Sequence, residues 1–211
     1  MMIFKNFLNI KKNISVKKDF LNLLKNQPQL FETLKPTYKY SYSKKKISKY
    51  KKFTSMRVIG MGGSILGTEA IYDFLKKKIK KKITFVNNLN SNADYFKDKG
   101  INLNLIISKS GNTLETIANA NTLIKNKDSS IIITENKDSY LTNLASQLKA
   151  EIFEHKNYVG GRYSVLSEVG MLPAELMNLN ESKFKQFNSL IKNKIFVNNL
   201  INNVAATLNL I

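Results

Sequence analysis

The stretch that most constrains the fold of this chain runs from Arg57 to Thr68 and reads Arg-Val-Ile-Gly-Met-Gly-Gly-Ser-Ile-Leu-Gly-Thr. Val58 and Ile59 form a short apolar run of the kind found in buried strands. Glycines follow, and then Ser64 precedes an apolar-periodic segment, so we expect a strand, a glycine turn and a helix with Ser64 as its N-cap. Because bare amides and a helix N-terminus attract anions, the stretch predicts a phosphate or carboxylate near Ser64.

Short apolar segments alternate with helical ones from Met56 onward. Strands are expected at Val58–Gly60, Ile83–Val86, Leu103–Ile107, Ile131–Thr134 and Glu151–Phe153, and helices at Ile65–Lys78, Ala93–Lys97, Thr113–Lys125 and Tyr140–Leu148. This alternation predicts an α/β fold, a doubly wound five-stranded parallel sheet with helices on both faces. Ligands of such sheets bind at the carboxyl ends of the strands.

The sheet is expected within residues 51–180, between two helical regions. Residues 1–50 predict an N-terminal helical appendage followed by a linker, because Thr37–Phe53 is rich in Lys, Tyr and Ser and is interpreted as a solvated face. After the sheet we expect a helix over Val165–Met177 and another from Glu181 to the end, so residues 181–211 form a helical segment. The abrupt apolar ending at Ile211 leads us to expect a fragment of a longer protein.

The composition excludes several classes of function. The formal net charge is +19, but only Arg57 and Arg162 are arginines among 34 basic residues, so we interpret the charge as a general lysine bias and expect no nucleic-acid partner. The chain has no cysteine, which excludes disulfides and thiolate chemistry and is compatible with a cytoplasmic location. No apolar run approaches 18 residues, so we expect no membrane span.

Two further motifs follow strands and are expected at the same edge of the sheet as Ser64. Ser108–Thr116 reads Ser-Lys-Ser-Gly-Asn-Thr-Leu-Glu-Thr and opens a helix; its hydroxyls and amides suit a phosphate. Gly160–Ser164 reads Gly-Gly-Arg-Tyr-Ser and brings the guanidinium of Arg162 to that edge. Each motif also has a structural explanation: a tight turn, a helix cap and a surface ion pair, respectively.

Other candidate sites are weaker. Neither the Gly-Lys-Ser/Thr of a P-loop nor the acidic residue of a dinucleotide fold is present at the required position. Arg57 stands at a strand start and is interpreted as structural. His155, the only histidine, is expected at a solvent-exposed strand end rather than in catalysis. No His and carboxylate cluster has metal-ligand spacing, so we expect no metal and no cofactor.

Taken together, the three motifs resemble those of the phosphoglucose isomerase family, within the sugar isomerase (SIS) domain superfamily. Gly60–Gly67 is similar to the family's Gly-x-Gly-Gly-Ser-x-x-Gly turn, and Ser108–Thr116 to its Ser-Lys-Thr-x-x-Thr-x-Glu-Thr segment. The third motif, with its continuation to Pro173, resembles a signature of the isomerase itself. The resemblance covers about Arg57 to Pro173 and implies a flavodoxin-like SIS domain.

The resemblance assigns roles to individual residues. It implies a phosphate site made by Ser64, Ser108, Ser110, Thr113 and Thr116, close backbone approach at Gly63 and Gly161, and catalytic or neighbouring roles for Arg162, Glu115 and Lys109. Arg162 would stabilise an enediolate near C1 and C2, while Glu115 would contact the sugar or order the site. The sequence departs from many family members at Gly111 and Asn112, which replace Phe-Thr.

The implied reaction interconverts glucose 6-phosphate and fructose 6-phosphate through a cis-enediol, in glycolysis and gluconeogenesis, by a cytoplasmic homodimer. In the family the base, a histidine and a lysine lie further along, and no residue here matches them; Glu168 and Glu175 are interpreted as helix-surface carboxylates. Two alternatives stay open, a non-catalytic sugar-phosphate-binding module and an isomerase that also accepts mannose 6-phosphate.

Overall fold

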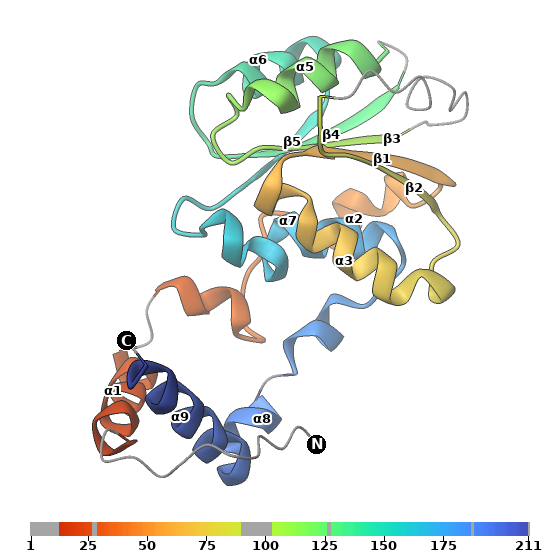
Figure 1. Ribbon diagram of the computed structural model, residues 1–211. Helices are drawn as coiled ribbons and strands as arrows, with labels where there is room; N and C mark the ends of the chain where they lie inside the picture. The colour runs from red at the N-terminus through yellow and green to blue at the C-terminus, as the bar shows by residue number, and fades with distance from the viewer. Residues whose placement is uncertain (1–12, 27–28, 90–102, 126–127, 187, 211) are drawn as a thin grey trace. The chain divides into compact units, whose positions relative to one another are not determined.

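The computed structural model describes residues 13–26, 29–89, 103–125, 128–186 and 188–210 (Figure 1). By its internal contacts the chain divides into two compact units. The larger unit is Thr37–Phe184, and the smaller combines Met1–Pro36 with Lys185–Ile211. The larger unit contains the sheet and all three motifs.

The sheet of the larger unit is parallel throughout. Its strands are β1 (Ser55–Gly60), β2 (Lys82–Val86), β3 (Leu103–Ile107), β4 (Ser129–Thr134) and β5 (Glu151–Glu154), arranged in the order β2-β1-β3-β4-β5. The central strand β3 is buried along its whole length, as expected for a strand covered on both faces. In this register Gly60 lies opposite Ile107, so the first two motifs leave neighbouring strands at the same edge.

Helices cover both faces of the sheet, which confirms the doubly wound α/β fold (Figure 1). One face carries α3 (Leu66–Leu75) and α7 (Glu168–Leu176); the other carries α5 (Leu114–Leu123) and α6 (Tyr140–Leu148). Short helices fill the connections: α2 (Lys44–Ile47), η2 (Ser48–Tyr50), η3 (Gly62–Ser64), η4 (Lys76–Lys78), η5 (Gly161–Leu166) and η6 (Glu181–Lys185). The helix expected over Ala93–Lys97 lies outside the described residues.

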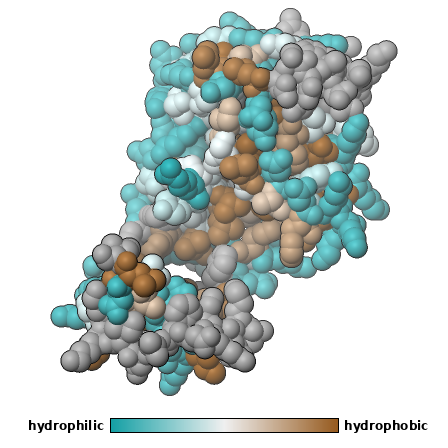
Figure 2. Space-filling model, viewed as in Figure 1, coloured by the Kyte–Doolittle hydropathy of each residue, from teal (hydrophilic) through white to brown (hydrophobic). Residues whose placement is uncertain are grey.

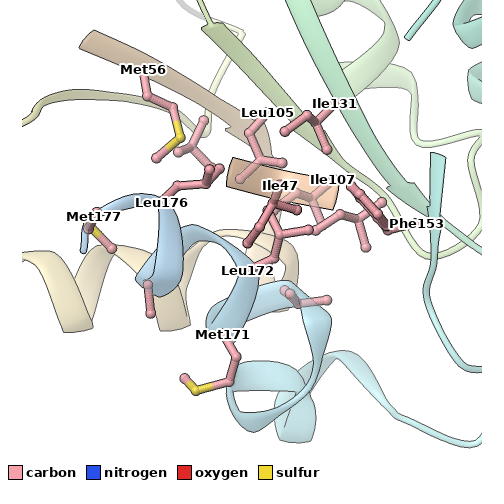
Figure 3. Packing of buried hydrophobic residues seen from close by; sticks show 14 of the residues in the cluster. Ile47, Met56, Leu105, Ile107, Ile131, Phe153, Met171, Leu172, Leu176 and Met177 are labelled. Carbon is pink, nitrogen blue, oxygen red and sulfur yellow. The ribbon is translucent and has the colours of Figure 1, made fainter. Parts of the chain in front are cut away.

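Alternating side chains divide the core of the larger unit into two clusters. Met56 and Val58 of β1 point to the cluster beneath α3 and α7, and Ile59 points to the cluster beneath α5 and α6. Figure 3 shows the first cluster, where Leu172 and Leu176 of α7 lie against the strand side chains. Fully burying each such side chain contributes about 1.5–3 kcal/mol, so this packing fixes α7 on the sheet.

The prediction for Thr37–Phe53 is only partly right: most of its lysines lie on a solvated face, but the segment is more than a linker. Tyr38, Tyr42, Ile47 and Tyr50 are buried, and all except Tyr38 belong to the core cluster beneath α7. The ring of Tyr42 stacks on Tyr40 with centroids 4.9 Å apart, and meets the edge of Phe153 at 6.2 Å. Lysine is the most frequent residue in this segment, so its composition does not reveal that its tyrosines form an aromatic face that packs on the sheet.

Glu168 and Glu175 are also not the surface carboxylates expected, since both are buried on α7. The carboxylate of Glu168 accepts hydrogen bonds from the Tyr38 hydroxyl at 2.9 Å and from the backbone N–H of Ser41 at 2.8 Å. Glu175 pairs with two lysine ammonium groups, those of Lys44 at 3.3 Å and Lys51 at 3.1 Å. The partners come from the supposed linker, which supplies the hydrogen bonds and charges that buried carboxylates require.

Arg57 has the structural role expected of it. Its guanidinium is buried, and Nη1 donates to Asn104 Oδ1 at 3.2 Å and to the carbonyl oxygen of Leu123 at 3.0 Å. Leu123 is the last residue of α5, where the carbonyl groups lack intrahelical partners and a positive charge is favourable. Arg57 therefore holds the far end of a helix whose first turn lies at the motif edge.

The smaller unit consists of α1 (Asn13–Asn26), η1 (Gln29–Leu34), α8 (Asn188–Lys192) and α9 (Lys194–Leu208). The C-terminal helix expected from Glu181 is divided, because Asn193 caps α9 by accepting from the N–H groups of Ile195 and Phe196. A cavity of about 330 Å³ lies among these helices and is lined mainly by apolar side chains, including Phe20 and Leu200.

The surface of the larger unit carries hydrophobic side chains among the hydrophilic ones (Figure 2). Among the described residues of this unit, Phe74 on α3 is the most exposed of them at 88%. Among the described residues, no helix is both long enough and apolar enough to cross a membrane.

Candidate functional site

The first motif forms the connection between β1 and α3. Gly62 adopts a φ of +54°, a conformation that glycine reaches without strain, and starts the short helix η3. Ser64 is not the N-cap that we expected: α3 begins at Leu66, and Ile65 holds the cap position without a side-chain hydrogen bond. The reason is local, because the N–H of Ile65 bonds to Gly62 O at 3.1 Å and adds a tight turn before the helix. The partly exposed Ser64 side chain is thereby left outside the cap.

The second motif leaves the adjacent strand β3. The hydroxyl oxygens of Ser108 and Thr113 lie 2.8 Å apart, and Ser108 Oγ also accepts from the N–H of Gly111 at 3.2 Å. Ser110 is exposed, Thr113 is partly exposed, and Ser108 and Thr116 are buried at 1% exposure each. The Thr116 hydroxyl is buried with no hydrogen-bond partner in the part of the chain that the structure describes. The motif thus combines two accessible hydroxyls with two buried ones.

Gly111 and Asn112, where the sequence departs from the family pattern, attach this loop to α6. Gly111 has a φ of +71°, and a Cβ there would lie 2.2 Å from Ser139 Oγ, so a side chain has neither the conformation nor the space. The side-chain oxygen of Asn112 accepts from the N–H of Tyr140 at 2.8 Å, at the first residue of α6. The replacement of Phe-Thr therefore has a structural basis in this chain.

The third motif folds into η5 and lies against the first. A Cβ on Gly63 would fall 2.2 Å from the carbonyl oxygen of Gly161, so the two backbones are in contact. The buried Ser164 hydroxyl lies 3.0 Å from Gly63 O and 2.8 Å from Gly161 O. Gly67 meets Val165 in the same way, since a Cβ added to Gly67 would lie 2.8 Å from Val165 Cγ2. The bond from Ser164 to Gly161 lies within η5, and the other contacts join the segment Gly63–Gly67 to the loop that carries Arg162.

Lys109 links the second motif to the segment that precedes the third. Its Nζ donates to the carbonyl oxygen of Asn157 at 2.6 Å and lies 3.7 Å from the Glu135 carboxylate. Lys137 hydrogen-bonds the same carboxylate and lowers the pKa of Glu135, so that group stays ionised beside Lys109. The three motifs are thus connected at one edge of the sheet, the first and third directly and the second through Lys109.

The comparison with known families agrees with this arrangement. Residues 11–210 match the family model described as phosphoglucose isomerase. The chain belongs to the phosphoglucose isomerase family.

Curated relatives of this family are considerably longer than the chain. The glucose-6-phosphate isomerase of Methanocaldococcus jannaschii is 33% identical over 181 residues, which cover 79% of this chain and 44% of the relative. The glucose-6-phosphate isomerase of Onion yellows phytoplasma is 37% identical over 142 residues, covering 58% of this chain and 33% of the relative. The chain therefore spans less than half the length of either relative.

A solved structure supports the fold independently of sequence. The crystal structure of a hypothetical protein from Thermus thermophilus superposes with a TM-score of 0.74 at 18% identity, covering 95% of this chain and 53% of that one. At this level of identity the similarity shows the arrangement of helices and strands alone.

The residues that the family resemblance singles out differ in their surroundings. Arg162 is exposed and makes no hydrogen bond or ion pair with any other described residue. Glu115 is partly exposed in the first turn of α5, and no described contact joins it to Arg162. The contact of Gly63 with Gly161 brings the first and third motifs together, while the roles assigned to the individual side chains stay predictions.

His155 is buried at 2% exposure, so the prediction of a solvent-exposed strand end is wrong. The backbone N–H of His155 donates to Thr134 O at 2.7 Å and extends the pairing of β5 with β4. The ring Nδ1 lies 3.2 Å from Lys156 O. Burial lowers the pKa of His155, which favours the neutral ring. The missed signal was the two-residue period of β5, since buried Phe153 places His155 on the same face.

Among the described residues, no group of three or more His, Asp or Glu side chains is arranged to hold a metal ion.

Proposed function

We propose that this chain supplies the phosphate-binding part and the enediolate-stabilising arginine of an isomerase that interconverts glucose 6-phosphate and fructose 6-phosphate through a cis-enediol. The observation that carries the proposal is the backbone contact of Gly63 with Gly161 at the carboxyl edge of the sheet. It brings a glycine turn suited to anions next to a loop with an exposed guanidinium. A hexose phosphate carries a group that complements each feature. Its phosphate dianion suits the glycine turn, and the carbonyl at its other end gains negative charge that a guanidinium can stabilise.

The phosphate is proposed to bind between the first turns of α3 and α5. Both helices begin at the carboxyl edge, on neighbouring strands, and their N-termini favour negative charge. Ser64, Ser110 and Thr113 have at least partly exposed side chains and are proposed to donate directly to the phosphate. Ser108 and Thr116 are buried. Ser108 is proposed to orient the Thr113 hydroxyl, and the Thr116 hydroxyl, which has no described partner, is proposed as a further donor in the first turn of α5.

Arg162 is proposed to stabilise the negative charge that develops on the C1 and C2 oxygens. Its guanidinium is exposed and without a described partner, so it is available to a substrate. A donor aimed at developing charge lowers the barrier more than it strengthens ground-state binding. Glu115 is proposed to contact the sugar or to order the site, and Lys109 to lie close by. We propose that the proton-transferring carboxylate comes from a segment corresponding to the remaining length of the relatives.

The first test has two parts, binding and turnover by the chain itself and the effect of Arg162→Ala in a longer protein that contains it. For the 211-residue chain we expect binding of fructose 6-phosphate by calorimetry and no turnover in an assay coupled to glucose 6-phosphate formation. In a protein that contains the chain and the remaining family length, Arg162→Ala should lower kcat about 10²–10³-fold with a much smaller change in KM. Lys80→Ala is the matched control, because it removes one exposed positive charge next to β2 at the opposite edge.

The outcomes separate the alternatives. Equal losses in kcat and in binding would contradict the role of Arg162. Turnover by the 211-residue chain itself would mean that the base lies within it, and Glu115 would be the first candidate. Binding without turnover in the longer protein as well would favour a non-catalytic sugar-phosphate module, and comparable turnover of mannose 6-phosphate would favour the broader isomerase.

We further propose that the full-length protein is a cytoplasmic homodimer, as the family resemblance implies. Sedimentation equilibrium of the full-length protein tests the dimer directly, and a monomer at micromolar concentration would contradict it.

A further inference from the structure

Ser164 is the last residue of the third motif, and its hydroxyl joins that motif to the first. It is buried at 1% exposure, whereas its neighbours Arg162 and Tyr163 are exposed. Because η5 is a 3₁₀ helix with about three residues per turn, adjacent side chains point in different directions. The Ser164 hydroxyl therefore faces the interior, whereas the Arg162 side chain is exposed to solvent.

The hydroxyl occupies a position between two backbone carbonyl groups. Oγ is 3.0 Å from Gly63 O, in the first motif, and 2.8 Å from Gly161 O, in the third. A serine hydroxyl has a single proton, which is shared between these two acceptors. The bond to Gly63 spans 101 positions in the sequence, and the bond to Gly161 closes the turn that presents Arg162.

The turn is also fixed from its other side. Ser167 Oγ donates to Ser164 O at 2.6 Å and accepts from the N–H of Val169, which caps α7. Thr68 Oγ1 in α3 donates to Val169 O at 3.1 Å. These bonds attach η5 to α3 and α7. Among the side-chain hydrogen bonds of the described residues, only that of the Ser164 hydroxyl reaches the glycine turn after β1.

We propose that Ser164 is a positioning residue, which sets the distance between the phosphate-binding turn and Arg162. This inference rests on the proposed function. The phosphate and the reacting carbons are at opposite ends of a hexose phosphate, so a substrate held by the first motif meets Arg162 correctly only if the two loops keep a fixed separation. Loss of the hydroxyl releases the Gly63 carbonyl from η5, and Arg162 then loses its alignment with the developing charge.

The test uses the 211-residue chain and three probes. Inorganic phosphate reports on the anion site alone, fructose 6-phosphate on the neutral sugar, and 6-phosphogluconate carries a carboxylate at C1, where the enediolate charge would develop. Ser164→Ala should weaken binding of 6-phosphogluconate about tenfold while binding of inorganic phosphate changes less than about twofold. Ser164→Thr keeps the hydroxyl and should restore most of the lost affinity.

Ser167→Ala is the matched control, because it removes a hydroxyl from the same turn without touching Gly63. It should lower the melting temperature yet leave the ratio of the 6-phosphogluconate and phosphate affinities unchanged. If Ser164→Ala does not fold, Ser164→Cys tests the same point, since a thiol of similar shape donates only a weak hydrogen bond.

Four results would overturn the inference. If the parent chain prefers 6-phosphogluconate and neither Ser164→Ala nor Ser164→Cys alters that preference, Ser164 does not position the site, although the proposed function stands. If Ser164→Ala weakens all three probes equally, or if Ser167→Ala gives the same change, the role is merely structural. A parent chain that binds none of the sugar phosphates would remove the proposed function, and this inference with it.

Discussion

Replacing Gly63 by alanine tests the contact on which the site depends. The added Cβ would lie 2.2 Å from the carbonyl oxygen, 2.4 Å from the carbonyl carbon and 2.8 Å from the Cα of Gly161, all of them backbone atoms. Backbone cannot move aside as a flexible side chain can, so the clash must displace η3 or η5. Overpacking of this kind costs about 1–3 kcal/mol, and the absence of any side-chain relief places Gly63→Ala near the upper end, at about 3 kcal/mol.

Gly161→Ala provides the matched control from the other side of the contact. A Cβ on Gly161 meets only the Cα of Gly63, at 3.8 Å, which is an ordinary van der Waals distance. The same chemical change should therefore leave the free energy of unfolding within about 0.5 kcal/mol of the parent value. The prediction is thus an asymmetry between two glycines that touch each other.

Tyrosine fluorescence during urea unfolding measures this asymmetry within the larger unit. The chain has no tryptophan, and all nine tyrosines lie within Thr37–Phe184. A loss of about 3 kcal/mol at constant denaturant slope should appear for Gly63→Ala, together with a melting temperature lower by about 6–12 °C. Equal stability of the two variants, or a larger loss for Gly161→Ala, would refute the contact as the structure gives it.

Three further predictions concern stability. Burial lowers the pKa of His155, so the unfolded state binds more protons than the folded state below about pH 6.5, and the free energy of unfolding should fall from about pH 7 to pH 5.5. His155→Asn should flatten this dependence in urea unfolding. An unchanged slope in that variant would contradict the role of His155. Glu175→Gln leaves Lys44 and Lys51 facing a neutral amide and should cost about 1–3 kcal/mol in urea unfolding; a neutral result would show that the pairs contribute nothing. Gly111→Ala should cost about 1–3 kcal/mol, since φ is +71° and Ser139 fills the space, and wild-type stability by calorimetry would count against that geometry.

The sheet could be predicted because its strands carry a strong local signal. β3 and β4 carry the short apolar runs Leu105–Ile107 and Ile131–Ile133, which are typical of strands covered by helices on both faces. The glycine turn was equally predictable, since Gly62 needs a positive φ. The order of the strands, β2-β1-β3-β4-β5, was not predicted from the sequence, and it places the first two motifs on neighbouring strands.

Features that depend on distant partners were not predictable from the sequence. The contact of Gly63 with Gly161 joins residues almost a hundred positions apart and leaves no local pattern beyond the glycines. Ser64 has the residue type of an N-cap, but the extra turn closed by Gly62 moves the helix start to Leu66. His155 was interpreted from its charged neighbours, whereas the pleat of β5 determined its burial.

The buried carboxylate of Glu168 connects the misjudged N-terminal segment to the proposed site. Burial and the nearby Glu168 charge raise the pKa of Tyr38, so its hydroxyl keeps the proton and remains a donor to that carboxylate. Glu168 is the first residue of α7 and is separated from η5 by Ser167 alone, so the bonds from Tyr38 and Ser41 fix the point at which the Arg162 loop enters the helix. Segment 37–51 therefore anchors the start of α7, the helix that follows the loop carrying Arg162.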